Sequence, residues 1–93
     1  MTWIKTVRLS EASAELLRAL EAQRPLYPQE YEAPVLPIDE ELAGIVASHS
    51  LIPDALFHAF STFGVLMSPE LPLSRRQHEM ITTTVSVTNR CFY

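Results

Sequence analysis

The sequence predicts an all-α fold, and three observations lead to that prediction. Apolar residues recur at intervals of three and four along several stretches, as they do on one face of a helix. Ser74 and Gln77 have the spacing of a capping box, a helix start in which each side chain satisfies a backbone amide. Most of the seven prolines lie between the expected helices, where proline ends or begins one.

The first expected helix covers residues 13–24. Ser13 stands at its start, Leu16, Leu17 and Leu20 form an apolar stripe, and Pro25 ends it. Residues 1–9 are too short and irregular for an independent element. We expect them to form an N-terminal arm on the body of the protein or across a subunit interface, where tryptophan such as Trp3 is enriched.

The two middle helices are expected at residues 39–50 and 53–67. Asp39 is the expected cap of the first, whose apolar face carries Leu42, Ile45, Val46 and His49. Pro53 opens the second, because proline is favoured at the first helical position. A broad apolar stripe follows, which is more typical of a core than of a cofactor site. Its residues are Leu56, Ala59, Phe60, Phe63, Leu66 and Met67.

The last expected helix covers residues 74–88. Its β-branched residues after Met80 also suit a strand, but the capping box and a helical stripe through Thr84 favour a helix. Asn89 tolerates the conformation that ends helices. We therefore expect a break there and a second helix beginning near Arg90 or Cys91, where the macrodipole would favour a thiolate. In one straight helix, Glu79 and Cys91 would lie about 18 Å apart.

Composition excludes several classes of protein. The net charge of −4 argues against a nucleic-acid or anionic-membrane partner. No apolar run reaches the ~18 residues of a membrane span, and no signal peptide opens the sequence. One cysteine forms no internal disulfide. We expect a single cytoplasmic domain over residues 1–93, with no cofactor and no metal, because the three histidines lack metal-ligand spacing.

The stretch LSRRQHEMITTTVSVTNRCFY, residues 73–93, resembles the alkylhydroperoxidase D and carboxymuconolactone decarboxylase family, in its peroxidase-related branch. The family pattern has a Leu-Ser start, an Arg-rich first turn, a Glu, a helix with small and β-branched residues, and Cys-x-x-Cys-x-x-x-His. The resemblance implies a helical bundle and a thiol-dependent peroxidase that uses a peroxide substrate and a thiol reductant. Decarboxylase chemistry fits less well, because decarboxylase members generally lack the cysteine pair.

The same resemblance implies the site. Glu79 falls on the acidic proton-relay residue and Cys91 on the first cysteine, which would be the resolving thiol. Tyr93 stands where some members have His. His49 and His78 are candidates for supporting roles, with a core position the simpler expectation for His49 and a solvated face for His78. Without the resemblance, Glu79 reads as an ordinary surface acid.

The resemblance places the second cysteine at residue 94 and the histidine at residue 98, beyond the 93 residues. We expect residues 1–93 to be the front part of a longer domain and nearly inactive alone. Our hypothesis is that residue 94 is selenocysteine, whose UGA codon reads as a stop, or cysteine. A cloning boundary or a proteolytic fragment is the competing explanation, and the codon after Tyr93 decides between them.

The alternative function is a non-catalytic helical oligomerisation or interaction module, or an inactive fragment. Broad apolar stripes on so short a chain leave apolar surface exposed unless copies associate. We therefore expect a homo-oligomer, with the N-terminal arm or the stripe from Leu56 to Met67 in the contact.

Overall fold

The computed structural model describes residues 3–33, 41–42 and 44–91. These residues form helices and turns and contain no strand, which confirms the predicted all-α class. The α-helices are α1 (Ala14–Gln23), α2 (Gly44–Ala47), α3 (Pro53–Leu66) and α4 (Arg75–Thr88). Three short 3-10 turns, η1 (Leu9–Glu11), η2 (Arg24–Leu26) and η3 (Gln29–Tyr31), lie before and after α1.

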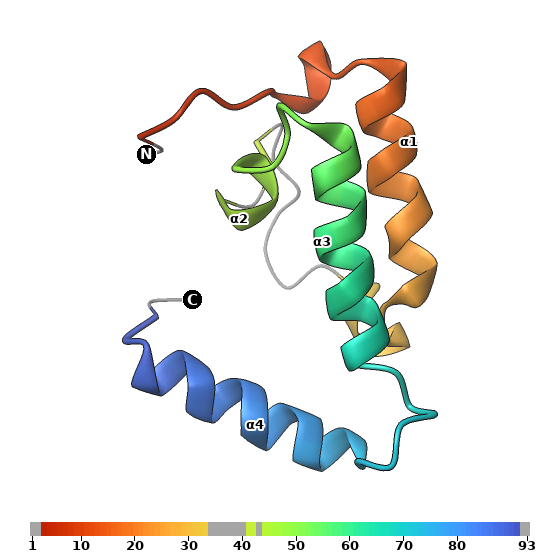
Figure 1. The fold of residues 1–93 in the computed structure, drawn as a ribbon, viewed down its shortest axis with the longest axis vertical. Helices are drawn as coiled ribbons and strands as arrows, with labels where there is room; N and C mark the ends of the chain where they lie inside the picture. The colour runs from red at the N-terminus through yellow and green to blue at the C-terminus, as the bar shows by residue number, and fades with distance from the viewer. Residues whose placement is uncertain (1–2, 34–40, 43, 92–93) are drawn as a thin grey trace.

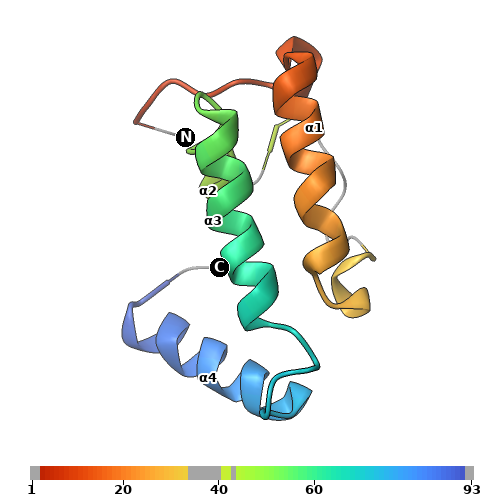
Figure 2. The same ribbon diagram turned by 45° about the vertical axis from the view of Figure 1, so that its right-hand side comes forward.

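Helices α1 and α3 form the centre of the molecule. They lie side by side and run in the same direction, and the connection between them returns the chain to the starting end (Figures 1 and 2). Leu16 of α1 and Leu56 of α3 are the largest fully buried side chains. Ala19 joins them in the core, and Val7, Leu20, Val46 and Phe60 are among the residues packed around it.

The sequence predicted three of the four helices closely. Ser13 accepts a hydrogen bond from the Leu16 amide at the start of α1, and Pro53 is the first residue of α3. Within the predicted stripes, however, Leu17 and Leu66 are exposed, and Leu66 keeps 61% of its surface. Three members of the predicted stripe do face inward, because Leu56 and Met67, the C-cap of α3, are buried and Phe60 is partly buried, and Gly64 joins them.

The helix predicted at residues 39–50 is much shorter. Glu41 and Leu42 are not helical, and α2 covers four residues before the turns at residues 48–51. Asp39, the predicted cap, lies outside the described residues. Ser50 is buried, and its hydroxyl accepts a hydrogen bond from the Val7 amide at 2.8 Å, so the N-terminal arm does reach the body. Trp3 is fully exposed.

Gly64 brings η2 against α3. A Cβ atom at this position would lie 2.6 Å from the Leu26 Cβ and 3.1 Å from the Leu26 carbonyl oxygen. No side chain fits there without a shift of the backbone, so glycine is required by the close approach. This contact places Tyr27, η3 and Tyr31 beside the end of α3, where Tyr27 and Tyr31 both contact the Phe63 ring.

Helix α4 turns away from the α1–α3 pair after the connection at residues 67–74 and crosses below it (Figure 1). Its capping box is complete, with the Gln77 amide donating to the Ser74 hydroxyl and the Gln77 side chain accepting from the Ser74 amide at 2.8 Å. The partly or fully buried residues of α4 are polar: Arg75, His78, Glu79, Thr82 and Ser86. Its apolar residues Met80, Ile81, Val85 and Val87 are all more than half exposed.

Candidate functional site

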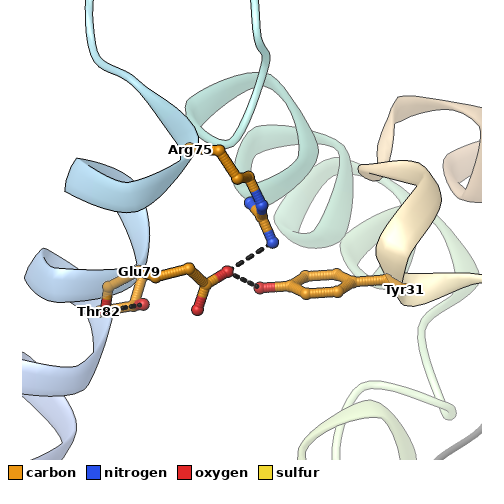
Figure 3. Close-up of polar contacts among 4 residues, drawn as sticks. All are labelled: Tyr31, Arg75, Glu79 and Thr82. Atoms are coloured by element: carbon orange, nitrogen blue, oxygen red, sulfur yellow. Dashed lines mark hydrogen bonds and ion pairs between the residues drawn. The ribbon is translucent and has the colours of Figure 1, made fainter.

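Glu79, the predicted proton-relay acid, lies in a polar contact between α4 and the rest of the molecule. Its carboxylate forms an ion pair with Arg75, one turn earlier in α4, and accepts a hydrogen bond from the Tyr31 hydroxyl at 3.2 Å. Figure 3 shows the Arg75 and Tyr31 side chains converging on the same carboxylate oxygen. We call these three residues the Tyr31 contact.

Tyr31 connects this contact to α3. The Arg75 guanidinium carbon lies 4.9 Å from the centre of the Tyr31 ring, within the range of a cation–π interaction. The other neighbours of the ring are aromatic, with Phe63 stacked at 6.5 Å and Tyr27 edge-on at 6.4 Å between ring centres. Through these contacts Tyr31 holds the first turns of α4 against the end of α3.

The charge of Arg75 is secured by its neighbours. The contact with Tyr31, ahead of the charge of Glu79, raises the pKa of the Arg75 guanidinium above its ordinary value. Arginine is already protonated at all physiological pH values, so Arg75 stays charged and keeps neutralising Glu79. Because the pair is partly exposed, it contributes at most about 1 kcal/mol to stability.

Cys91 lies at the opposite end of α4, next to a helix C-cap. The Cys91 amide donates to the Ser86 carbonyl at 2.9 Å and the Arg90 amide to the Val87 carbonyl at 3.0 Å. Arg90 has φ +52°, so these bonds form a Schellman motif with a left-handed residue after the cap Asn89. The predicted break is therefore confirmed, but the left-handed residue is Arg90 rather than Asn89.

The predicted helix start at Cys91 is not seen. Cys91 itself is not helical, and residues 92 and 93 lie outside the described part of the chain. Its thiol is free and exposed, and it follows the end of α4 at which the macrodipole is negative. The stabilisation that a helix N-terminus gives to a thiolate was the physical reason for expecting a reactive Cys91, and these residues do not supply it.

The described structure does not bring Glu79 and Cys91 together. Helix α4 is continuous from Glu79 to Thr88. This stretch alone places the backbone of Glu79 about 13 Å from the end of the helix that precedes Cys91. The Glu79 side chain is held by the Tyr31 contact, whereas Cys91 follows the far end of the helix. The predicted proximity depended on a fold-back at Asn89, and the Schellman motif instead ends the helix without reversing it over Glu79.

The two histidines occupy unequal environments. His49 is half-buried, with its Nδ1 2.9 Å from the Ile45 carbonyl oxygen and its ring edge-on to Phe60, as expected for a core position. His78 is 4% exposed, so the predicted solvated face is wrong for this residue. Neither of its ring nitrogens has a hydrogen-bond partner among the described residues. Tyr93 lies outside them.

A surface cavity of about 680 Å³ lies beside the Tyr31 contact. Residues 25–30, the end of α3 with the following turn, and Arg75 form its walls, which carry the carboxylates of Glu30 and Glu70. Neither Glu79 nor Cys91 lines it.

In the described ranges, no three His, Cys, Asp or Glu side chains gather as a metal-binding group, and no helix is long and apolar enough to cross a membrane.

Sequence reasoning missed the parts played by Arg75 and Tyr31. The spacing of Arg75 and Glu79, four residues apart in a helix, was a sufficient signal for their ion pair. The hydrogen bond from Tyr31 joins residues 48 positions apart, and no local pattern indicates it.

Comparison with known proteins found no matching family model, no matching curated protein and no matching solved structure.

Proposed function

We propose that this protein takes part in thiol-dependent reduction of peroxides, with Cys91 as its redox-active thiol. The observation that carries the proposal is the exposure of Cys91, the one cysteine of the sequence, immediately after a fully capped helix. A peroxide, an oxidised thiol and a thiol reductant can all reach a sulfur in this position. The resemblance of residues 73–93 to the alkylhydroperoxidase D family gives the reaction class.

The chemistry requires two thiols. A thiolate attacks one peroxide oxygen, so that an S–O bond forms, the O–O bond breaks and an alcohol leaves with a proton. A second thiolate then attacks the sulfenic acid, an S–S bond forms, and the departing hydroxide takes up a proton and leaves as water. Cys91 takes the second role by the resemblance. Two equivalents of a thiol reductant then exchange with this disulfide, so that both sulfurs return to the thiol form and the reductant leaves as its own disulfide.

Glu79 enters the proposal as the group that removes a thiol proton, a role that rests on the resemblance. Its carboxylate must leave Tyr31 and Arg75 to do so, and the residues after Thr88 must fold back toward it. This requirement predicts the direction of one substitution. Loss of the Tyr31 hydroxyl removes one of the two interactions that hold the Glu79 carboxylate, so it should speed the reaction of Cys91.

The test measures how fast Cys91 joins a small thiol. The 93-residue chain is treated with an excess of a small disulfide, which stands in for the oxidised partner thiol. The Cys91 thiolate attacks it, one small thiolate leaves, and the mixed disulfide is followed by intact-mass spectrometry. The control thiol is Thr83→Cys in a Cys91→Ser background, another exposed position on α4. We expect Cys91 to react faster than the control by less than the ~100-fold that a positioned base contributes, because the Glu79 carboxylate must first leave the Tyr31 contact.

Two further variants assign the role of Glu79. Glu79→Gln should lower the Cys91 rate to that of the control thiol, and Tyr31→Phe should raise it. Equal rates for Cys91 and the control thiol would contradict the redox proposal. An advantage of Cys91 that persists in Glu79→Gln would remove Glu79 from it.

A further inference from the structure

The outward face of α4 has the pattern of a helix–helix interface. Leu73, Gln77, Met80, Thr84 and Val87 follow one another at alternating intervals of four and three, the spacing of a coiled-coil seam. All five are exposed. Ile81 and Val85 flank the seam, and six of these seven residues line a shallow surface groove of about 370 Å³. We call this set the α4 seam.

The polar face of the same helix is already occupied. Arg75, His78, Glu79, Thr82 and Ser86 are the residues of α4 that lose solvent contact, and they lie on the side of the helix opposite the seam. Helix α4 therefore directs its polar side toward the Tyr31 contact and its apolar side away from the body. A water-soluble helix normally has the reverse orientation, so the seam has the character of a surface that is covered by another helix.

The chain as a whole exposes more surface than a compact chain of its mass. The chain exposes 7694 Å², whereas a compact folded chain of 10.5 kDa exposes about 5,400 Å². This excess of about 2,300 Å² is distributed over the whole chain, whereas a standard interface takes ~800 Å² from each partner. The radius of gyration, 14.2 Å, also exceeds the ~12 Å of a compact chain of this length.

The charge distribution is compatible with a second copy of the chain as the partner. The α4 seam contains no ionisable residue, so two copies of it meet without like charges opposing each other. Arg76 flanks the seam near the start of α4 and is exposed. A parallel pair would place both copies of Arg76 at one level, whereas an antiparallel pair places each near Thr83 or Thr84 of the other copy. Antiparallel packing also sets the helix macrodipoles in opposition.

We propose that two copies of this chain form a two-fold symmetric dimer through antiparallel packing of their α4 seams. The proposal uses no property of the Cys91 thiol, so it stands or falls separately from the redox chemistry. It differs from the interface expected from sequence, because neither the N-terminal arm nor the α3 stripe forms the contact.

The first experiment measures mass in solution. Light scattering or sedimentation of the 93-residue chain should give twice 10.5 kDa. Met80→Glu, in the middle of the seam, should give a monomer with unchanged helical content by circular dichroism. The matched control is Leu66→Glu on α3, where the native side chain is similarly exposed, at 61% against 52% for Met80. The control should remain a dimer.

A second experiment does not depend on whether the charged variants fold, and it also tests the direction of packing. Met80→Cys in a Cys91→Ser background should cross-link to itself with a short bis-maleimide, whereas Leu66→Cys in the same background should not. In the native chain the two Cys91 residues lie at opposite ends of an antiparallel pair and should not cross-link. A monomeric native chain, a dimer broken by Leu66→Glu but not by Met80→Glu, or efficient cross-linking of native Cys91 overturns the proposal.

Discussion

At the scale of single residues, two tyrosines next to each other in space have different tasks. Tyr31 uses its hydroxyl to hold Glu79 and its ring to contact Phe63, so it joins three segments of the chain. Tyr27 packs edge-on against Phe63 at 5.6 Å and is the more deeply placed of the two. Burial raises the pKa of Tyr27 to about 12, because it withholds the water that would otherwise solvate the phenolate.

This shift predicts the alkaline behaviour of the protein. In the unfolded chain a tyrosine ionises near pH 10, so the contribution of Tyr27 to stability is complete below about pH 10. It is lost as the pH rises through 12, because the folded state resists the ionisation that the unfolded state permits. A titration of tyrosinate absorbance should show one component near pH 12. Tyr27→Phe should remove it and Tyr31→Phe should not, whereas a single shared transition near pH 10 would contradict this assignment.

At the scale of secondary-structure elements, α4 depends on its own ends more than on packing. Its capping box satisfies the first turn, and the Schellman motif satisfies the last. Its contact with the body consists of the Tyr31 contact, which is polar and partly exposed, and of the buried His78 ring. Capping interactions therefore make up an unusually large share of what keeps this helix formed in the absence of a partner.

Loss of the N-terminal cap should consequently act locally. Ser74→Ala removes the hydroxyl that accepts from the Gln77 amide, at a cost of about 1 kcal/mol. Amide hydrogen exchange in α4 should become about fivefold faster, since 1 kcal/mol corresponds to that factor. Exchange in α1 and α3 should not change. Ser86→Ala, which leaves the cap intact, is the control, and equal acceleration by both substitutions would count against the cap.

At the scale of the whole molecule, stability comes from a small core between α1 and α3. Leu16 and Leu56 are the largest side chains fully removed from water, and the remaining buried apolar residues are smaller or lie near the helix ends. A chain of 93 residues buries a limited share of its surface on folding, so each core side chain represents a large fraction of the total.

Leu56→Ala should therefore be severely destabilising. Deletion of a buried leucine side chain costs about 2–5 kcal/mol, which is comparable to the stability of many small domains. The midpoint of urea denaturation, followed by circular dichroism, should fall strongly. Leu66→Ala removes the same atoms from an exposed position of α3 and should change stability by no more than about 0.5 kcal/mol. Similar shifts for the two variants would place the core elsewhere.

The parts of the fold that the sequence predicted well are those with local causes. Ser13, Pro53 and the box formed by Ser74 and Gln77 act within one helical turn, and the helices they open were predicted within a residue or two. The helix expected at 39–50 failed because an acidic first turn and a short apolar stripe do not fix its length. Glu41 and Leu42 remain outside α2.

The parts that were missed depend on how elements pack. Hydrophobic periodicity assigns the apolar side of a helix to the core, but α4 turns Met80 outward and His78 inward. The buried side of α4 is determined by Tyr31 and Phe63, which are distant in sequence. For the candidate site, the positions of Glu79 and Cys91 on either side of a break were predicted. Their separation follows from the continuous helix up to Thr88 and from the cap at Arg90, whose conformation no local pattern indicates.

The two faces of α4 respond in opposite ways to dissolved salt. The Tyr31 contact is an exposed electrostatic attachment, so counterions at high ionic strength weaken the pairing of Arg75 with Glu79. The apolar face gains from the same change when the salt is a sulfate or phosphate, because such ions are excluded from apolar surface. Rising salt of this kind should therefore weaken the hold of the chain's own body on α4 and strengthen the proposed contact with a second copy.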